Sequence, residues 1–535
     1  MNAVKLFNPS SRSGRVILLS IIVLLFVVCI KTMTIDYEDN DDYVYSRIMS
    51  GSYSGTPSAM TVYEGYIFGL FVSWLYRIVP NIVEWYILVF HALYILSYIV
   101  IANKLLTSKI SNNSKCIAIV SLSCAQLYLL ISPQFTILAG ELALAACVAI
   151  IGRPRAKDYI AFVICVFLSS QIRIQSLLMV IAPMMPLLFL PIKYREKSYW
   201  IKPIVVFASI VLVFGVNIVS NRVYYENDDW KYYIEYNKPR GIIEQSLCKY
   251  NAVDILKDPI LKVEYSNLCN SRLIDGKILS IEDMNECAEY VQSMPFSFFK
   301  MNILPYFDLF NQHGGCFMVV WFIGLFIYAI RKKDWKSIWV IVFTGVLFLI
   351  ELCYCMTTSF AKERLVICMM MYLFVVGSVC TYRLLKDRSF TVCALLLSIV
   401  FGSIYIVKSY AWEHKINLQL KSIEKINKIV ADVPYDKVFI IGMPIHAEAY
   451  KVSTTPITNK QICKGWLNNI PLHKEYYSGY ESLLDRVPIV ISHKAENNIS
   501  DIEFILKHNG IEVDKDYLYR DDECAVILLR KLNNK

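Results

Sequence analysis

The sequence predicts a polytopic α-helical membrane protein with about eleven transmembrane helices and a C-terminal α/β domain. Hydrophobic residues make up 56% of the 535 residues and charged residues only 19%, whereas soluble globular chains carry about 45–50% and about 25%. Several separate apolar runs approach the roughly 20 residues that a helix needs to cross a bilayer. Basic residues gather between these runs. These observations exclude a cytosolic enzyme and a secreted disulfide scaffold.

The short gaps between apolar runs are rich in lysine and arginine and poor in acids. The gaps lie at 5–15, 104–115, 153–158, 193–202, 331–336 and 383–388. By the positive-inside rule these gaps face the cytoplasm, so the N-terminus is expected inside. The same rule accounts for the net charge of +9. Nucleic acid is therefore not an expected partner, and the lipid bilayer is.

The apolar runs are assigned in order along the chain. The run 16–32 predicts an uncleaved signal-anchor helix. If both 61–80 and 83–102 crossed the bilayer, the next basic gap would fall outside. The run 61–80 mixes Glu64 and Arg77 with aromatic residues, so it predicts an amphipathic helix in the outer interface. Further spans are expected at 116–132, 135–151, 159–170, 174–192, 201–219, 316–330, 338–356, 365–382 and 389–408.

Two domains follow from this assignment. Residues 1–408 form the transmembrane domain, with outer loops at 33–82 and 220–315. Residues 409–535 form an extracytoplasmic α/β domain. Short apolar runs with turn residues at their ends predict three strands, and a polar–apolar pattern predicts one helix. The strands are expected at 437–442, 487–492 and 524–529, and the helix at 501–508.

A group of acids directly follows the first span. The five carboxylates lie within seven residues and are Asp36, Glu38, Asp39, Asp41 and Asp42. Acids contribute little to membrane orientation, so topology does not explain their concentration. Partial burial raises the pKa of a carboxylate toward a value that suits a general base. The group predicts a catalytic or binding loop, with a solvated acidic loop as the alternative.

Three arginines are candidates for binding an anion, because the guanidinium group matches phosphate oxygens. Arg173 lies between two apolar runs, of which the first is only about a dozen residues long and therefore short for a span, and Arg364 begins a span. Arg240 ends the stretch 227–240, whose aromatic and polar residues suit an acceptor cleft. The alternatives are interfacial anchoring for Arg173 and Arg364 and membrane packing for the aromatic residues. Glu141, inside a span, is a candidate partner of Arg173.

The run Asp41-Asp42-Tyr43-Val44-Tyr45, followed by Ser50-Gly51, resembles the first outer loop of the glycosyltransferase C superfamily. Residues 65–74 resemble the juxtamembrane helix of that family, and the order of spans and soluble segments is also similar. The resemblance implies an integral membrane enzyme that takes a sugar from a polyprenyl-phosphate carrier. It implies that Asp41 is the base and that Asp42 orients the acceptor or a metal. Asp replaces the usual Glu, and the interval to Gly51 is shorter, so the choice among Asp39, Asp41 and Asp42 stays open.

The predicted function is an inverting glycosyltransferase of polysaccharide biosynthesis in a bacterial plasma membrane. It would pass a sugar from a polyprenyl-phosphate donor to a cell-envelope glycan or lipid acceptor. Asp41 and Asp42 would be catalytic, and the substrate-binding residues would be Asp39, Arg173, Arg240 and Arg364. No metal site is assigned and no cofactor is certain, although a divalent cation is compatible with the acids. The alternatives are a polymerase or ligase of lipid-linked oligosaccharides and a non-catalytic flippase or transporter of lipid-linked sugars.

Overall fold

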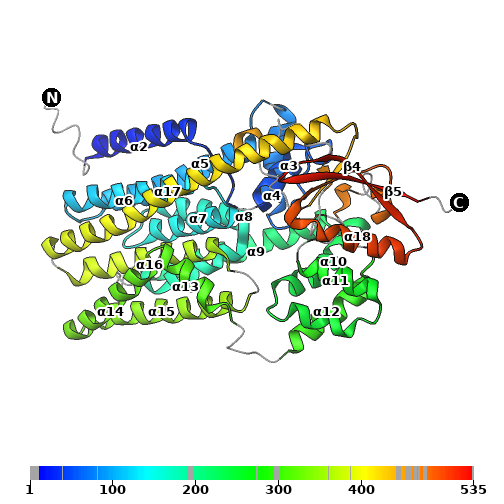
Figure 1. The fold of residues 1–535 in the computed structure, drawn as a ribbon. Helices are drawn as coiled ribbons and strands as arrows, with labels where there is room; N and C mark the ends of the chain where they lie inside the picture. The colour runs from blue at the N-terminus through cyan, green and yellow to red at the C-terminus, as the bar shows by residue number, and fades with distance from the viewer. Residues whose placement is uncertain are drawn as a thin grey trace.

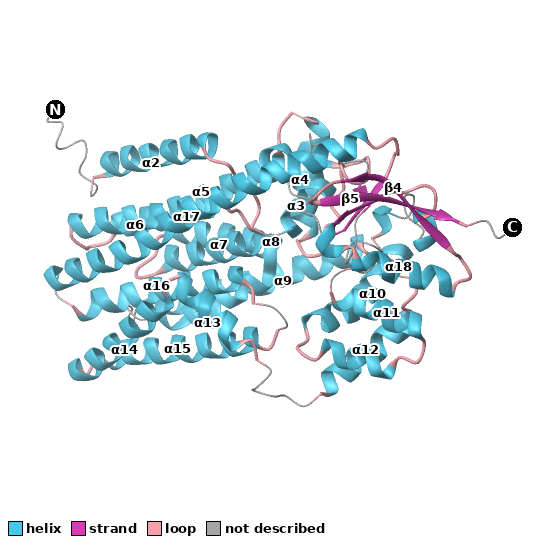
Figure 2. Cartoon of the chain, viewed as in Figure 1, coloured by secondary structure: helices cyan, strands magenta, loops and turns pink. Residues whose placement is uncertain are grey.

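The fold is a long bundle of helices with a soluble part at one end (Figure 1; Figure 2). The computed structural model describes residues 11–38, 40–80, 82–189, 197–270, 272, 275, 277–294, 301–358, 361–385, 387–441, 448–452, 461–462, 467, 470–473 and 479–532. The soluble part contains a small sheet and a group of short helices. Most helices of the bundle run along its length, between this part and the opposite end of the bundle (Figure 1).

Nine helices among the described residues are long and apolar enough to cross a membrane. This finding confirms the predicted polytopic helical membrane protein. The nine are α2 (Arg12–Thr32), α5 (Trp85–Thr107), α6 (Asn112–Ile131), α8 (Ala156–Phe189), α9 (Lys197–Tyr224), α14 (Gly315–Lys332), α15 (Trp335–Met356), α16 (Glu363–Leu384) and α17 (Asp387–Asp432). Two shorter apolar helices are α4 (Tyr66–Ile78) and α7 (Phe135–Ile150). Eleven spans were expected from the sequence because α7 was counted as one span and the two parts of α8 as two.

Helix α8 consists of two arms that reverse direction at Arg173, whose φ of −158° and ψ of 104° are not helical. The Lys202 ammonium group donates to the carbonyl oxygen of Gly152 at 2.7 Å and to that of Leu188 at 2.8 Å. Gly152 precedes the first arm and Leu188 ends the second. A straight helix of this length would hold its ends about 50 Å apart. The arms therefore lie side by side, and Arg173 stands at the turn between them.

Helix α7 lies in the centre of the bundle, and all of its residues are buried. It packs against both arms of α8 and against α5 and α16. The side chain of Gln134 caps the helix by accepting a hydrogen bond from the Ile137 N–H at 3.0 Å. This packing fixes the N-terminus of α7 inside the protein, at the end of the bundle that carries the soluble part.

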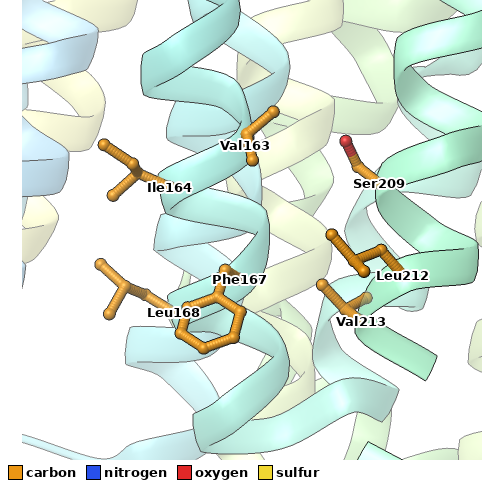
Figure 3. A pocket seen from close by; sticks show the side chains of 7 residues that line it. All are labelled: Val163, Ile164, Phe167, Leu168, Ser209, Leu212 and Val213. Carbon is orange, nitrogen blue, oxygen red and sulfur yellow. The ribbon is translucent and has the colours of Figure 1, made fainter. Parts of the chain in front are cut away.

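An apolar cavity of about 250 Å³ lies between α8 and α9. Figure 3 shows the side chains of Val163 and Phe167 on one wall and those of Leu212 and Val213 on the other. Ser209 contributes the one hydroxyl group among the residues that line the cavity. The residues that line this cavity carry no charge, so the cavity is not the binding site that the acidic and basic residues predict.

The soluble part combines the loop between α9 and α14 with the C-terminal residues. The loop forms α10 (Asp228–Gln245), η1 (Lys249–Ile255), α11 (Pro259–Cys269), α12 (Ile281–Ser293) and α13 (Ile303–Gln312). The C-terminal residues form a sheet in the order β2-β1-β3-β5-β4. Its strands are β1 (Val438–Ile441), β2 (Gln461–Ile462), β3 (Ile489–Ser492), β4 (Val513–Arg520) and β5 (Cys524–Lys531), and α18 (Asn497–His508) packs with them. The sheet therefore has five strands, and the expectation of three is wrong.

Apolar side chains fill both faces of the sheet. Residues of α18 cover one face, together with Ile260 and Val263 of α11. The last turns of α17, including Ile426 and Val430, cover the other face. Strands β1, β2 and β3 are parallel, and β5 runs antiparallel to β3 and β4. Helix α17 thus continues from the bundle to the sheet, and the boundary expected at residue 409 falls inside this helix.

A short C-terminal segment returns to the start of the acidic loop. It contains η3 (Ala449–Lys451). The Ala449 N–H donates to the Ile35 carbonyl oxygen at 2.8 Å. The Tyr450 hydroxyl oxygen lies 2.7 Å from Nδ1 of His91, a buried residue of α5. Ala449 belongs to the same apolar core as the bundle helices, so this segment packs as part of the bundle.

Candidate active site

The N-terminus of α7 brings together three of the predicted site residues. Asp42, in α3 (Asn40–Ser50), accepts a hydrogen bond from the Phe135 N–H, with Oδ1 at 3.1 Å. The guanidinium carbon of Arg173 lies 4.8 Å from the centre of the Phe135 ring, and that of Arg364 lies 6.0 Å from it. These residues come from α3, α8 and α16, which are far apart in the sequence. Their meeting at Phe135 defines the candidate active site.

Local structure explains how each side chain reaches this place. Asp41 and Asp42 occupy the first turn of α3, where carboxylates are favoured by the helix dipole. Arg173 is placed by the reversal in α8 and also donates from Nη1 to the Thr136 hydroxyl at 3.1 Å. Arg364 lies in the first turn of α16. Two guanidinium groups therefore stand beside the positive end of the α7 dipole, an arrangement that attracts an anion.

Asp41 and Asp42 differ in accessibility. Asp42 has no exposed surface, and its Oδ1 also accepts a hydrogen bond from the Tyr86 hydroxyl at 2.9 Å. Asp41 is only partly buried. Burial lowers the pKa of Lys362, nearby Arg173 lowers it further, and Asp41 raises it. Asp41 is thus close enough to Lys362 to act on its pKa, and it is the more accessible of the two carboxyl groups.

Glu64 is a site residue that the sequence interpretation missed. It was assigned to an amphipathic helix, but in the structure it precedes α4 and has only 3% of its surface exposed. Its Oε1 accepts from the Tyr86 hydroxyl at 2.9 Å. The next residue, Gly65, donates its N–H to the Gln171 carbonyl oxygen at 2.7 Å, and an added Cβ would lie within 2.7 Å of that oxygen. An acid directly before an apolar helix was the available signal.

The other predicted residues have different surroundings. Asp39 lies outside the described residues. Arg240 is buried in α10, where it pairs with Glu244 and donates to the Tyr63 hydroxyl at 3.0 Å. Its contacts therefore support the segment before Glu64 instead of joining Arg173 and Arg364 at Phe135. Trp230, Tyr233 and Tyr236 of the aromatic stretch are buried in apolar cores of the protein, so they match neither an open acceptor cleft nor packing against the membrane.

Glu141 has partners other than Arg173. Its carboxylate accepts from the Ser97 hydroxyl at 2.6 Å and from the Gln126 amide at 3.4 Å. The suggested pairing of Glu141 with Arg173 is therefore replaced by contacts with α5 and α6. Because α7 is buried on every side, neighbouring helices supply the polar partners of this carboxylate.

A second polar cluster lies beside Arg364. Glu363 Oε1 is 2.9 Å from Nε2 of His313 and 2.7 Å from the Lys408 ammonium nitrogen. The Tyr128 hydroxyl donates to the same oxygen at 3.3 Å. Glu363 thereby joins α16 to α17, α6 and the end of α13. The cluster fixes the first turn of α16, and with it the backbone position of Arg364.

Burial raises the pKa of several carboxyl groups around the site. It raises the pKa of Asp36 and that of Glu38 to about 7, and that of Glu64 to about 8. Burial, together with nearby Glu64, also raises the pKa of Asp42. Opposing effects are smaller: the Tyr37 N–H lowers the pKa of Asp36, and Arg364 lowers that of Glu38. The described residues contain no group of three or more His, Cys, Asp or Glu side chains that could hold a metal ion.

These raised pKa values predict that the protein becomes less stable as the pH rises from about 5 to about 8. In this range the folded chain holds protons on Asp36, Glu38 and Glu64 that the unfolded chain has released, so each unit of pH lowers the free energy of unfolding. The thermal unfolding midpoint in detergent should fall by several degrees across the range. The combined variant Asp36→Asn, Glu38→Gln and Glu64→Gln should show a flatter dependence. A midpoint that rises with pH in the wild type would contradict this prediction.

Comparisons with known proteins support the fold. No family model matches the chain, and no curated protein matches it. The crystal structure of ArnT from Cupriavidus metallidurans in the apo state superposes with a TM-score of 0.53 and 9% sequence identity, covering 96% of this chain and 98% of that one. A second crystal structure of that ArnT, bound to undecaprenyl phosphate, has a TM-score of 0.48 and 10% identity, over 97% and 98% of the chains. The chain therefore has a fold like that of ArnT, as the resemblance stated from the sequence predicts.

Proposed function

We propose that this chain, which has the fold of ArnT, is a membrane glycosyltransferase that moves a sugar from a polyprenyl-phosphate donor to a glycan or glycolipid of the cell envelope. The main support is the convergence of Asp42, Arg173 and Arg364 at the N-terminus of α7, with the more accessible Asp41 next to Asp42 in the first turn of α3. A base and an anion-binding pair are the two kinds of group that displacement of a phosphate requires.

The reaction is a single displacement at the anomeric carbon of the donor sugar. Asp41 accepts the proton of the acceptor hydroxyl as its oxygen forms a bond to this carbon. The bond between the anomeric carbon and the phosphate oxygen breaks at the same time, and the phosphate leaves with the electron pair. Arg173 and Arg364 stabilise the charge that grows on the phosphate. Attack opposite to the leaving group inverts the anomeric configuration.

The proposed location is the outer face of a bacterial plasma membrane. The basic gaps between apolar helices support it, because the positive-inside rule predicts that the basic end of the bundle faces the cytoplasm and the opposite end faces outside. Lys104 and Lys202 lie at the basic end, where they donate to the carbonyl oxygens of Ala149, Gly152 and Leu188. The acidic loop and the sheet lie at the other end.

The proposal is tested by transfer of a labelled sugar from a panel of polyprenyl-phosphate monosaccharides to membrane glycolipids, catalysed by the purified protein in detergent. We expect transfer from at least one donor, with loss of transfer in Asp41→Asn. Glu141→Gln is the matched control. It also replaces a carboxylate by its amide, but Glu141 is buried outside the candidate site, where it binds Ser97.

The outcome distinguishes the alternatives. Joining of whole lipid-linked oligosaccharides, without monosaccharide transfer, would replace the proposal by the polymerase or ligase function. Movement of a lipid-linked sugar across vesicles without transfer would replace it by the flippase function. Transfer that is equal in the wild type and in Asp41→Asn would refute the assignment of the site.

A further inference from the structure

One hydroxyl group lies between two buried carboxyl groups. The Tyr86 oxygen is 2.9 Å from Oδ1 of Asp42 and 2.9 Å from Oε1 of Glu64. A tyrosine hydroxyl has one hydrogen and can donate it to only one of these oxygens. The second contact then joins two oxygens that both carry lone pairs, unless a carboxyl group carries a proton and donates it to the Tyr86 oxygen. Both contacts can be hydrogen bonds only if the three groups hold two protons. One is the hydroxyl hydrogen of Tyr86, and the other lies on a carboxyl group.

The surroundings also disfavour two negative charges. Asp42 and Tyr86 have no exposed surface, and Glu64 has 3%, so water does not stabilise the charges. Asp42 receives a second hydrogen bond from the Phe135 N–H. Glu64 Oε2 is buried and has no hydrogen-bond partner among the described residues. The Tyr86 hydroxyl and the Phe135 N–H are thus too few hydrogen-bond donors to offset the desolvation cost of two buried negative charges.

Charged and titratable groups from several elements act on the pair. Acidic or neutral groups are Tyr37 and Glu38, from the segment after α2, and Asp41, from α3; the cationic group is Arg173, from α8. Raised pKa values of Asp42 and Glu64 agree with this setting. One arginine faces several acids, and the same arginine is the proposed ligand of the donor phosphate.

We infer that Asp42 and Glu64 share a single proton through the Tyr86 hydroxyl at neutral pH, and that loss of this proton weakens the binding of a polyprenyl phosphate at Arg173. The second part rests on the proposed function. With the proton in place, the pair carries one negative charge beside Arg173. Without it, the pair carries two, and the additional charge competes with the phosphate for the guanidinium group. The proton titrates as a property of the pair, not of either residue. Glu64 and Tyr86 are thus positioning residues, which act through the charge around Arg173.

The first part is tested by infrared spectroscopy of the protein in detergent at neutral pH, without any ligand. The carbonyl band of a protonated carboxyl group should lose one equivalent in Glu64→Gln and one in Asp42→Asn. The double variant should lose no more than either single variant, because there is one proton to lose. Glu141→Gln should leave the band of the pair unchanged. Amides resemble protonated carboxyl groups in shape, and thermal unfolding checks that each variant is folded.

Two infrared results would overturn the shared proton. No loss in either single variant would mean that both groups are ionised. A loss of two equivalents in the double variant would mean that each group holds its own proton. Neither result depends on transferase activity, so failure of this inference is distinguishable from failure of the proposed function.

The second part is tested by measuring the Kd of a polyprenyl phosphate from pH about 6.5 to about 9.5. At the alkaline end we expect the wild type to bind the polyprenyl phosphate about tenfold more weakly than Glu64→Gln does. A tenfold difference corresponds to about 1.4 kcal/mol of added repulsion. The phosphate itself titrates equally in both proteins, so the difference between them reports the pair. Equal pH dependence in the two proteins would overturn the link to donor binding, and so would a weakening that is larger in Glu64→Gln.

Discussion

Asp41→Asn should lower the rate of sugar transfer by about 10²–10⁴-fold, the range that removal of a general base causes. The thermal unfolding midpoint should stay close to that of the wild type, because Asp41 is only partly buried and the amide keeps the shape of the side chain. Transfer assays with saturating donor and acceptor, alongside thermal unfolding in the same detergent, measure both effects.

Asp42 provides the comparison for this prediction. Asp42→Asn should lose less activity than Asp41→Asn, since Asp42 is fully buried and accepts hydrogen bonds from the Phe135 N–H and the Tyr86 hydroxyl. Asp42→Ala should instead lower the stability by about 1–3 kcal/mol, because it leaves the buried Phe135 N–H without its acceptor, while the Tyr86 hydroxyl keeps Glu64 as a partner. If Asp42→Asn loses more activity than Asp41→Asn while remaining folded, the base is Asp42.

Replacing Arg173 or Arg364 by glutamine should lower transfer by about 10²–10³-fold, as loss of a group that stabilises the transition-state charge does elsewhere. The two guanidinium groups flank the same ring, that of Phe135, so the double variant should be inactive. Arg173→Lys should recover part of the activity, because lysine keeps the charge but not the planar fork. Steady-state kinetics with varied donor concentration measure these effects.

Arg240→Gln is the matched control for the arginine variants. Arg240 is buried and paired with Glu244 and Tyr63, so its loss should lower the unfolding midpoint more than it changes the affinity for the donor. A variant of Arg240 that folds normally but no longer uses the donor would move the phosphate site toward α10. The same result would favour the polymerase or ligase alternative, which relies on outer-loop arginines.

Much of the fold could be predicted from the sequence because the hydrophobic signal of a membrane helix is local. The apolar runs predicted the helices of the bundle, and the separate spans expected at 159–170 and 174–192 correspond to the two arms of α8. The runs at 437–442, 487–492 and 524–529 correspond to β1, β3 and β5. Strand β4 was missed because it is a largely exposed edge strand with four charged residues, and its partner β5 supplies the apolar side of the pair.

The candidate site was only partly predictable because its members meet through long-range packing. Asp41, Asp42, Arg173 and Arg364 could be proposed by residue type and position. Nothing local indicates that Glu64 and Asp42 share the hydroxyl of Tyr86, since α5 must first pack against α3 and α4. The sequence around Arg240 contains the aromatic and polar residues expected of a binding cleft. In the folded loop, however, Arg240 pairs with Glu244. Residue type alone does not distinguish these cases.

The short segment around Ala449 has a consequence for how this protein can be divided. Its backbone bond to Ile35 and the contact of Tyr450 with His91 join the end of the chain to the root of the acidic loop. Helix α17 also runs unbroken across residue 408. A fragment that stops there would cut this helix and remove the segment that contacts Ile35 and His91. The C-terminal part is therefore not an exchangeable module: chimaeras with proteins of similar fold must carry it together with the acidic loop.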